Sequence, residues 1–261
     1  MKQVSPSVYL LAHTTVVNNG NPEKIVAAAG KLCYSSSDIK TVLDNLDEEK
    51  TKKFVDMLSS YGHQSPLEHI SFTFGVEGIS RACSHQLVRH RIASYSQQSQ
   101  RYVDLNESFA YVLPSSLENN DQAREIFENQ LISDIEAYKS VYDSLYNLYS
   151  EGVTDPKQLA KLKKKALEDA RAVLPNACET KIILTMNART LLNFFEERMC
   201  LRAQEEIREV ANMMLDLCLD VAPNVFKYAG PSCAFGPCKE GNMTCGNKQK
   251  PREKQLVKEY L

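Results

Sequence analysis

The residues most able to do chemistry are concentrated in residues 87–103, LVRHRIASYSQQSQRYV. This segment carries three arginines, one histidine and three serines, with no acidic side chain and no glycine. Guanidinium groups beside hydroxyl and amide groups supply the bidentate, charge-assisted hydrogen bonds that phosphate oxygens accept. Cations also suit the C-terminal end of a helix, so Arg89, His90 and Arg91 fit a solvated helix end as well. The spacing alone leaves both an anionic ligand site and a solvated loop open.

The chain as a whole is nearly neutral, so any basic site in it has to be local. Its 261 residues carry a formal net charge of -2, and 43% are hydrophobic and 25% charged, as in ordinary globular proteins. No apolar run approaches the roughly 20 residues of a membrane helix, and the N-terminus lacks the features of a secretory signal. We expect a cytoplasmic protein that binds neither nucleic acid nor a membrane.

Standard nucleotide and metal motifs are missing from the sequence. It contains neither G-x-x-x-x-G-K-[ST] nor a strand followed by G-x-G-x-x-G, and it has only 10 glycines. His63 and His69 are six residues apart with Glu68 between them, which does not match the H-E-x-x-H spacing of zinc enzymes. We therefore predict neither a Rossmann site, nor a P-loop, nor a metal site.

The eight cysteines are expected to be thiols, because the cytosol is reducing. Five have apolar surroundings typical of small core residues: Cys33, Cys83, Cys178, Cys200 and Cys218. The other three, Cys233, Cys238 and Cys245, follow the pattern C-x4-C-x6-C in a glycine-rich tail. Structural zinc sites usually have four ligands and a tighter first pair, so this pattern favours a mobile tail over a zinc site.

The hydrophobic periodicity predicts one α+β domain that positions these residues. Apolar alternation indicates strands at 7–14, 69–78 and 178–187. Helical spacing indicates helices within 21–36, 47–62, 80–91, 121–151, 154–175, 188–200 and 203–221. Asp155 and Pro156 mark a helix start, whereas Gly62 and Gly152 mark helix ends. The lysines within 161–165 suit a solvated helix face better than a nucleic-acid site.

Residues 89–102, RHRIASYSQQSQRY, match the R-H-R-x7-S motif of the flavin-dependent thymidylate synthases. Arg89, His90, Arg91 and Ser99 occupy the motif positions. Further segments resemble the same family in the same order: AAGKLCYSS, GHQSPLEHISFTF, ARAVLP and MNARTLLNFFEER. The resemblance covers about residues 20–210, and it predicts a synthase domain over 1–230 with a flexible tail over 231–261.

The resemblance implies an activity, a fold and an assembly. The family methylates dUMP to dTMP, taking the carbon from methylene-tetrahydrofolate and the electrons from NADPH through bound FAD. Its fold is α+β, with a central mostly antiparallel sheet, several long amphipathic helices and its own FAD site, which is not of the Rossmann type. The implied assembly is a homotetramer with shared active sites.

The resemblance also assigns residues by position. The implied cofactor-binding residues are Ser65, Arg89, His90, Arg91, Gln97, Asn187, Ala188, Arg189 and Asn193. The implied nucleotide-binding residues are Gln86, Leu87, Val88, Arg89, Gln97, Gln98, Ser99, Gln100, Arg101, Arg171 and Arg198, with Arg171 supplied by another subunit. Arg198 is the implied catalytic residue, which polarises the uracil ring and stabilises negative charge on it. Ser99 is assigned to nucleotide binding, because the sequence shows no base to activate it as a nucleophile.

Four positions depart from the family pattern, and two other functions compete with this one. Ser96 and Gln97 stand where the family often has Asn-Glu, and Glu197 and Arg202 replace an apolar residue and a histidine of some members. One alternative is an RNA-binding module that uses the arginines and the lysine run, although the balanced charge and the lack of tryptophan disfavour it. The other is a metal hydrolase built on His63, His69 and His90.

Overall fold

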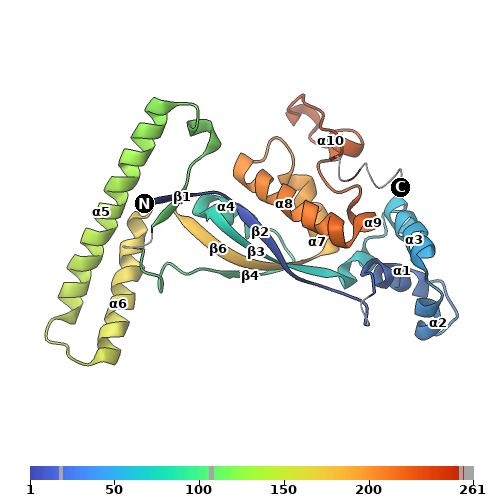
Figure 1. Ribbon diagram of the computed structural model, residues 1–261, viewed down its shortest axis with the longest axis horizontal. Coiled ribbons are helices and arrows are strands. Elements are labelled where there is room, and N and C mark those ends of the chain that lie inside the picture. The colour runs from blue at the N-terminus through green and yellow to red at the C-terminus, as the bar shows by residue number, and fades with distance from the viewer. Residues whose placement is uncertain (18–19, 106–108, 253–254, 256–261) are drawn as a thin grey trace. The chain divides into compact units, whose positions relative to one another are not determined.

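The computed structural model describes residues 1–17, 20–105, 109–252 and 255. Four strands form an antiparallel sheet in the order β2 (Ser7–His13), β3 (Ser71–Ser80), β6 (Glu179–Asn187) and β4 (Ala93–Gln97) (Figure 1). A second, two-stranded sheet pairs β1 (Lys2–Val4) with β5 (Ala110–Val112) in parallel. The predicted α+β class with a mostly antiparallel central sheet is confirmed.

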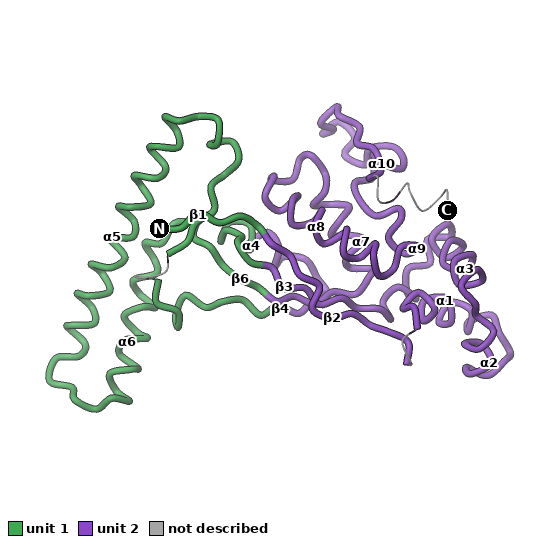
Figure 2. The backbone as a smooth tube through the Cα atoms, viewed as in Figure 1, with its two compact units in different colours: residues 1–6, 77–85, 96–182 green, residues 7–76, 86–95, 183–261 purple. Residues whose placement is uncertain are grey.

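The chain divides into two compact units (Figure 2). Unit 1 comprises residues 1–6, 77–85 and 96–182, and unit 2 comprises residues 7–76, 86–95 and 183–261. Strands β3, β4 and β6 and helix α4 (Arg81–Leu87) each contribute residues to both units. The segment that opened the sequence analysis is thereby divided between Tyr95 and Ser96.

Unit 1 contains a pair of long helices, α5 (Asp121–Ser150) and α6 (Pro156–Ala170), which pack against each other. The side chain of Asp155 accepts a hydrogen bond from the Lys157 amide at the start of α6, as predicted for a helix cap. Tyr138 of α5 and Leu167 of α6 are both buried in the cluster between the helices. Short 3-10 turns complete the unit at η2 (Ser115–Leu117) and η3 (Arg171–Val173).

The lysine run on α6 has partners within unit 1. Lys163 forms an ion pair with Asp104 at 3.2 Å, and Lys164 donates to the Tyr102 hydroxyl at 2.8 Å. The ammonium of Lys165 lies 4.2 Å from the centre of the Tyr149 ring. The lysines of α6 therefore contact neighbouring side chains of unit 1, as expected for a structural helix face.

Unit 2 holds the remaining helices around a mainly aliphatic core that also contains buried phenylalanines. They are α1 (Glu23–Leu32), α2 (Ile39–Asp44), α3 (Glu48–Ser60), η1 (Ser65–His69), α7 (Ala188–Arg198), α8 (Glu205–Val221), α9 (Pro223–Phe226), α10 (Ser232–Phe235) and η4 (Gly241–Met243). Helix α7 packs against α8 and η1, α8 packs against β2, and α3 packs against α1 and α9. In the core, the ring of Phe226 meets Phe72 and Phe195 edge-on at 5.4 and 6.0 Å between ring centres.

A buried carboxylate fixes the start of α9 within unit 2. Glu23 has no exposed surface, and its oxygens accept hydrogen bonds from the Asn224 amide N–H and side-chain amide, both at 2.6 Å. The Val225 amide donates to it as well, at 3.1 Å. Because the first amides of a helix have no partner within the helix, these hydrogen bonds to Glu23 anchor the start of α9.

The structure differs from the predicted elements at a few places. The helix expected over 80–91 ends at Leu87, while α2 and β4 were not predicted. In the tail, Arg252 donates to the Asn212 carbonyl and forms an ion pair with Asp216, each at 2.7 Å. A domain boundary at 230 and a flexible tail stay predictions, and residues 253–254 and 256–261 lie outside the described residues. Within the described residues, no helix is long and apolar enough to cross a membrane.

Candidate functional site

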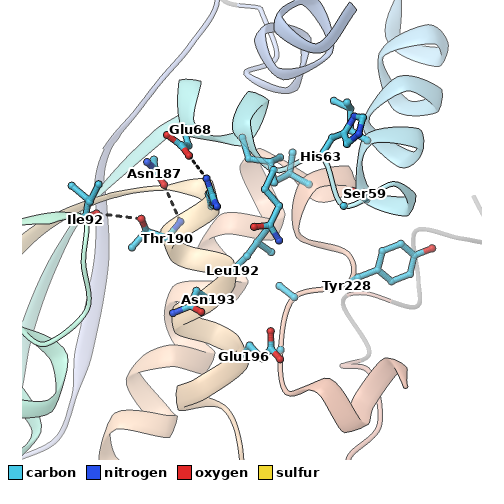
Figure 3. A pocket seen from close by; sticks show the side chains of 18 of the residues that line it. Ser59, His63, Glu68, Ile92, Asn187, Thr190, Leu192, Asn193, Glu196 and Tyr228 are labelled. Carbon is cyan, nitrogen blue, oxygen red and sulfur yellow. Dashed lines mark hydrogen bonds and ion pairs between the residues drawn. The ribbon is translucent and has the colours of Figure 1, made fainter. Parts of the chain in front are cut away.

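A pocket of about 740 Å³ lies within unit 2 and gathers four of the predicted cofactor residues. Its walls come from the end of α3, from η1, from α7 and from residues 225–230 (Figure 3). The predicted residues in the lining are Arg91, Asn187, Arg189 and Asn193. A volume of this size is typical of a small-molecule or cofactor site.

Local sequence signals build this pocket. Asn187 ends β6 and caps α7, since its side-chain oxygen accepts from the Thr190 amide at 2.8 Å. The Thr190 hydroxyl donates to the Ile92 carbonyl at 3.2 Å and so ties the 91–92 turn to α7. Gly62 has φ +68° with open space around it, so α3 can end at the pocket edge as predicted. The positive end of the α7 dipole therefore faces the pocket wall.

Two guanidinium groups lie in the pocket lining, and both have partners. Arg189 forms an ion pair with Glu68 at 2.5 Å. Arg91 donates to the carbonyls of Val88 and His90 at 2.6 and 3.1 Å. The Arg91 guanidinium also lies 5.6 Å from the centre of the Tyr95 ring. These contacts fix both cations in place while each retains further N–H donors.

The catalytic candidate Arg198, which does not line this pocket, is joined to His90. The Arg198 Nε–H donates to His90 Nε2 at 2.8 Å, and the imidazole packs edge-on against Phe194 at 4.9 Å. His90 is 6% exposed, and its Nδ1 lies 3.8 Å from a Glu197 carboxylate oxygen. Burial, aided by the Arg198 charge and opposed by Glu197, lowers the pKa of His90. The ring is therefore neutral at pH 7 and accepts the Arg198 hydrogen bond.

The remaining predicted residues of unit 2 differ in accessibility. Arg89 and Ser65 are exposed, and Ser65 begins η1. The Gln86 side chain donates to Gln204 at 2.5 Å, and its neighbour Val88 is partly buried. Leu87 and Ala188 have no exposed surface in the single chain, so they can support neighbouring site residues by packing rather than by touching a ligand.

The predicted nucleotide residues 97–101 lie within unit 1. Gln97 donates to the hydroxyls of Ser84 and Thr180 at 2.9 and 3.2 Å. The backbone amide of Gln98 donates to the Lys181 carbonyl at 2.8 Å, so the pairing of β4 with β6 continues one residue beyond β4. The neutral amide at position 97, where the family often has a carboxylate, is thus satisfied by hydroxyl acceptors.

The end of this segment contains a tight turn and a guanidinium with one buried nitrogen. The Arg101 amide donates to the Ser99 hydroxyl at 3.2 Å, and the Gln100 side chain donates to the Cys178 thiol at 3.6 Å. The Arg101 Nη2 pairs with Glu168 at 2.8 Å. Its Nε is buried and has no hydrogen-bond partner within the described residues. A buried donor without an acceptor is costly, which is the arrangement expected where a ligand supplies the acceptor.

Unit 1 adds one cation that the sequence did not single out, Arg81. Burial lowers the pKa of Arg81, and the neighbouring charge of Arg171 lowers it further. The Arg81 amide donates to the Cys178 carbonyl at 3.0 Å, and burial raises the pKa of that thiol to about 11. A bound anion would offset the repulsion between these two like charges. No spacing signal could have found Arg81, because residues 81 and 171 are far apart in sequence.

The three histidines of the hydrolase alternative have separate surroundings. His63 lines the 740 Å³ pocket, whereas His69 lines a different, mainly apolar hollow beside α1. His90 is buried and accepts a hydrogen bond from Arg198. Within the described ranges, no three His, Cys, Asp or Glu residues are grouped so that they could hold a metal ion. The geometry gives the hydrolase alternative no support.

The amino-acid sequence of the chain is similar to those of known proteins. Residues 10–224 match the family model described as thymidylate synthase complementing protein. The chain is 53% identical over 246 residues to a flavin-dependent thymidylate synthase of Clostridium tetani, covering 94% of this chain and 95% of the relative. A flavin-dependent thymidylate synthase of Geobacter sulfurreducens is 50% identical over 240 residues, covering 92% and 93%.

A solved structure is also similar. It is the crystal structure of the UMP/dUMP methylase PolB from Streptomyces cacaoi bound with 5-Br dUMP, with a TM-score of 0.69. The match covers 88% of this chain and 98% of that chain at 22% sequence identity. At that identity, the likeness supports the fold alone.

Proposed function

Because the chain belongs to the flavin-dependent thymidylate synthase family, we propose that its unit 2 pocket binds FAD and its 99–101 turn binds the nucleotide phosphate. The protein is an enzyme that methylates dUMP to dTMP. Its cofactor is FAD, and its co-substrates are NADPH and methylene-tetrahydrofolate. The observation that carries the proposal is the single pocket that brings together Arg91, Asn187, Arg189 and Asn193.

The pocket fits FAD in both size and chemistry. Leu58, Leu67 and Leu192 supply apolar surface for a flat ring, while Arg91 and Arg189 supply donors for phosphate oxygens. Bound FAD supplies the redox chemistry, and the protein's residues bind and orient the reactants. Glu68, which already pairs with Arg189, would keep that guanidinium oriented toward the pocket.

The proposed nucleotide site rests on the buried Nε–H of Arg101, which has no hydrogen-bond acceptor among the described residues. A phosphate oxygen would accept from its buried Nε, while the Ser99 hydroxyl and the Gln100 amide lie on the same turn. Arg171 of another subunit, as the resemblance implies, would be a further cation for the same phosphate, and it would bring its neighbour Arg81 with it. Ser99 binds the nucleotide in this proposal and does not attack it, since its hydroxyl has no hydrogen bond to a basic side chain among the described residues.

Arg198 is the residue that we assign to catalysis. A cation held against the uracil ring stabilises the negative charge that develops on the ring during methylation. His90 was expected to contact FAD, but its ring is nearly buried and engaged with Arg198 and Phe194. We assign His90 the role of a positioning residue that acts through Arg198.

The homotetramer with shared active sites also remains a proposal. On one face of the sheet in unit 2, Phe72 and Phe74 are buried beneath the helices. On the opposite face, Leu11 and Ile183 are 52% and 49% exposed. Apolar side chains on an uncovered sheet face favour a second copy of the chain as cover. Native mass spectrometry should give a tetramer, and a monomer at micromolar concentration would contradict this. A cytoplasmic location without nucleic-acid or membrane binding remains a prediction as well.

The direct test uses the purified protein. It should be yellow, release FAD on denaturation, and convert dUMP to dTMP when given NADPH and methylene-tetrahydrofolate. A colourless protein that cannot be reconstituted with FAD would overturn the proposal. Arg198→Ala should retain FAD and lose most methylation, by about 100-fold or more. If this variant loses FAD but turns over once reloaded, the role assigned to Arg198 is wrong.

A further inference from the structure

A second pocket in unit 2, of about 260 Å³, is lined by four cysteines. Three of them, Cys233, Cys238 and Cys245, belong to the glycine-rich tail around α10 and η4. The fourth is Cys200, which comes two residues after the end of α7. The sequence pattern argued against zinc because it offered three ligands, and the fold supplies the missing one.

We propose that Cys200, Cys233, Cys238 and Cys245 bind one zinc ion as thiolates. Four cysteines are a common ligand set for structural zinc, which is tetrahedral and closed to solvent. The set would join a residue at the end of α7 to a tail more than thirty positions later, as structural zinc sites do when they replace missing core. All eight cysteines of the chain are free thiols, so these four are available as ligands.

The surroundings of the four thiols suit thiolates. The backbone amide of Gln249 donates to Cys233 Sγ at 3.5 Å. Zinc-bound thiolates commonly accept such N–H hydrogen bonds from the residues around them. Two cations, Arg202 and Lys248, line the same pocket against a single carboxylate, Glu240. Four thiolates and one zinc ion carry a formal charge of −2, which a net positive lining offsets.

The thiols have to move to reach the ion. Within the part of the chain that the structure describes, no three of these side chains form a ready metal site. Cys238 and Cys245 are exposed, and nearby Gly241 and Gly246 have positive φ angles of 52° and 75°, conformations in which glycine is unstrained. Metal binding commonly completes the folding of such segments. Closure would fasten the tail to Cys200 and so to the end of the helix that carries Arg198.

The test is the metal content of the full-length protein purified under reducing conditions. Elemental analysis should find one zinc per chain, released by a thiol-modifying reagent. Cys200→Ser and Cys238→Ser should each lower zinc to a small fraction of one per chain. Cys33→Ser, a matched change at another exposed cysteine, should leave the zinc content unchanged.

A spectroscopic measurement keeps the test independent of variants that fail to fold. Metal-free, reduced wild-type protein titrated with Co²⁺ should develop the strong thiolate charge-transfer and tetrahedral d–d bands of a four-cysteine site at one equivalent. Weak octahedral bands, iron in place of zinc, or full zinc retention by folded Cys200→Ser would each overturn the proposal. A zinc-free wild-type protein that takes up no Zn²⁺ would overturn it as well.

Discussion

Arg198 Nε and His90 Nε2 lie 2.8 Å apart, and this hydrogen bond joins the end of α7 to the turn that carries the arginine-rich motif. A guanidinium only donates hydrogen bonds, so Nε2 must be unprotonated and the imidazole neutral. The ring is fixed by its edge-on contact with Phe194 and by Glu197 near Nδ1. The relationship makes the orientation of Arg198 depend on a residue that hardly reaches solvent.

His90→Phe should lower kcat about 10- to 100-fold while leaving the Kd for FAD nearly unchanged, because Arg198 would no longer be held in position against the uracil ring. His90→Gln, whose amide oxygen can accept at a similar place, should recover part of the loss. Steady-state kinetics and a flavin titration measure both effects. In an Arg198→Ala background, His90→Phe should add little further loss. A large loss of FAD affinity in His90→Phe would instead support a direct flavin contact.

The pKa of His90 predicts a pH dependence of stability. Burial, with Arg198 adding to it and Glu197 opposing it, lowers the pKa of His90 in the folded state below its ordinary 6.5. The unfolded chain therefore binds this proton first, so the contribution to stability is complete above pH 6.5 and is lost as the pH falls toward the lowered folded pKa. Urea unfolding of flavin-free protein between pH 7.5 and 5 should show wild type losing more stability than His90→Gln. Parallel curves for the two proteins would contradict the predicted shift.

Ser99→Ala separates nucleotide binding from nucleophilic catalysis. Loss of a hydroxyl that hydrogen-bonds a charged phosphate should raise KM for dUMP about tenfold or more, with kcat changed only a few-fold. Initial rates over a range of dUMP concentrations measure both constants. Ser94→Ala, at an exposed position of β4, serves as the matched control. Complete loss of turnover at saturating dUMP would revive Ser99 as a nucleophile.

Glu23 should be the most sensitive carboxylate for stability in unit 2. Glu23→Ala leaves the donors of Asn224 and Val225 without their buried acceptor, which should cost about 3 kcal/mol in the free energy of unfolding. Chemical denaturation measures this cost. The exposed Glu49→Ala change, which removes only a surface ion pair with Lys53, should leave that free energy nearly unchanged. Equal effects of the two substitutions would show that Glu23 does not anchor α9.

Much of the fold could be predicted from periodicity and capping residues. The long helix α5, its partner α6 with the Asp155 cap, and strand β6 all lie close to their predicted ranges. Strand β4 was not predicted because its sequence, ASYSQ, is short and mostly polar, with Tyr95 as its only aromatic or β-branched residue. Its pairing with β6 supplies the stability that its composition does not. Local pattern cannot reveal pairing between distant strands.

The sequence could predict which residues form the candidate site, but not how they are arranged in space. The motif identified Arg91 and the 187–193 segment, and the structure places them in one pocket. The sequence could not reveal that His90 would be buried against Arg198, since the two are more than one hundred residues apart. Cys200 was missed as a possible metal ligand for the same reason, because apolar neighbours made it resemble an ordinary core residue.

The central claim is that the first half of the motif binds flavin and the second half binds the nucleotide phosphate. The most direct test is the Kd for FAD of flavin-stripped Arg91→Ala and Arg101→Ala, measured by fluorescence titration beside wild type. Arg91→Ala should weaken FAD binding about 10- to 100-fold through loss of charge-assisted contacts, whereas Arg101→Ala should bind FAD as wild type does. Equal weakening by both substitutions, or an unchanged Kd in Arg91→Ala, would contradict the division of the motif.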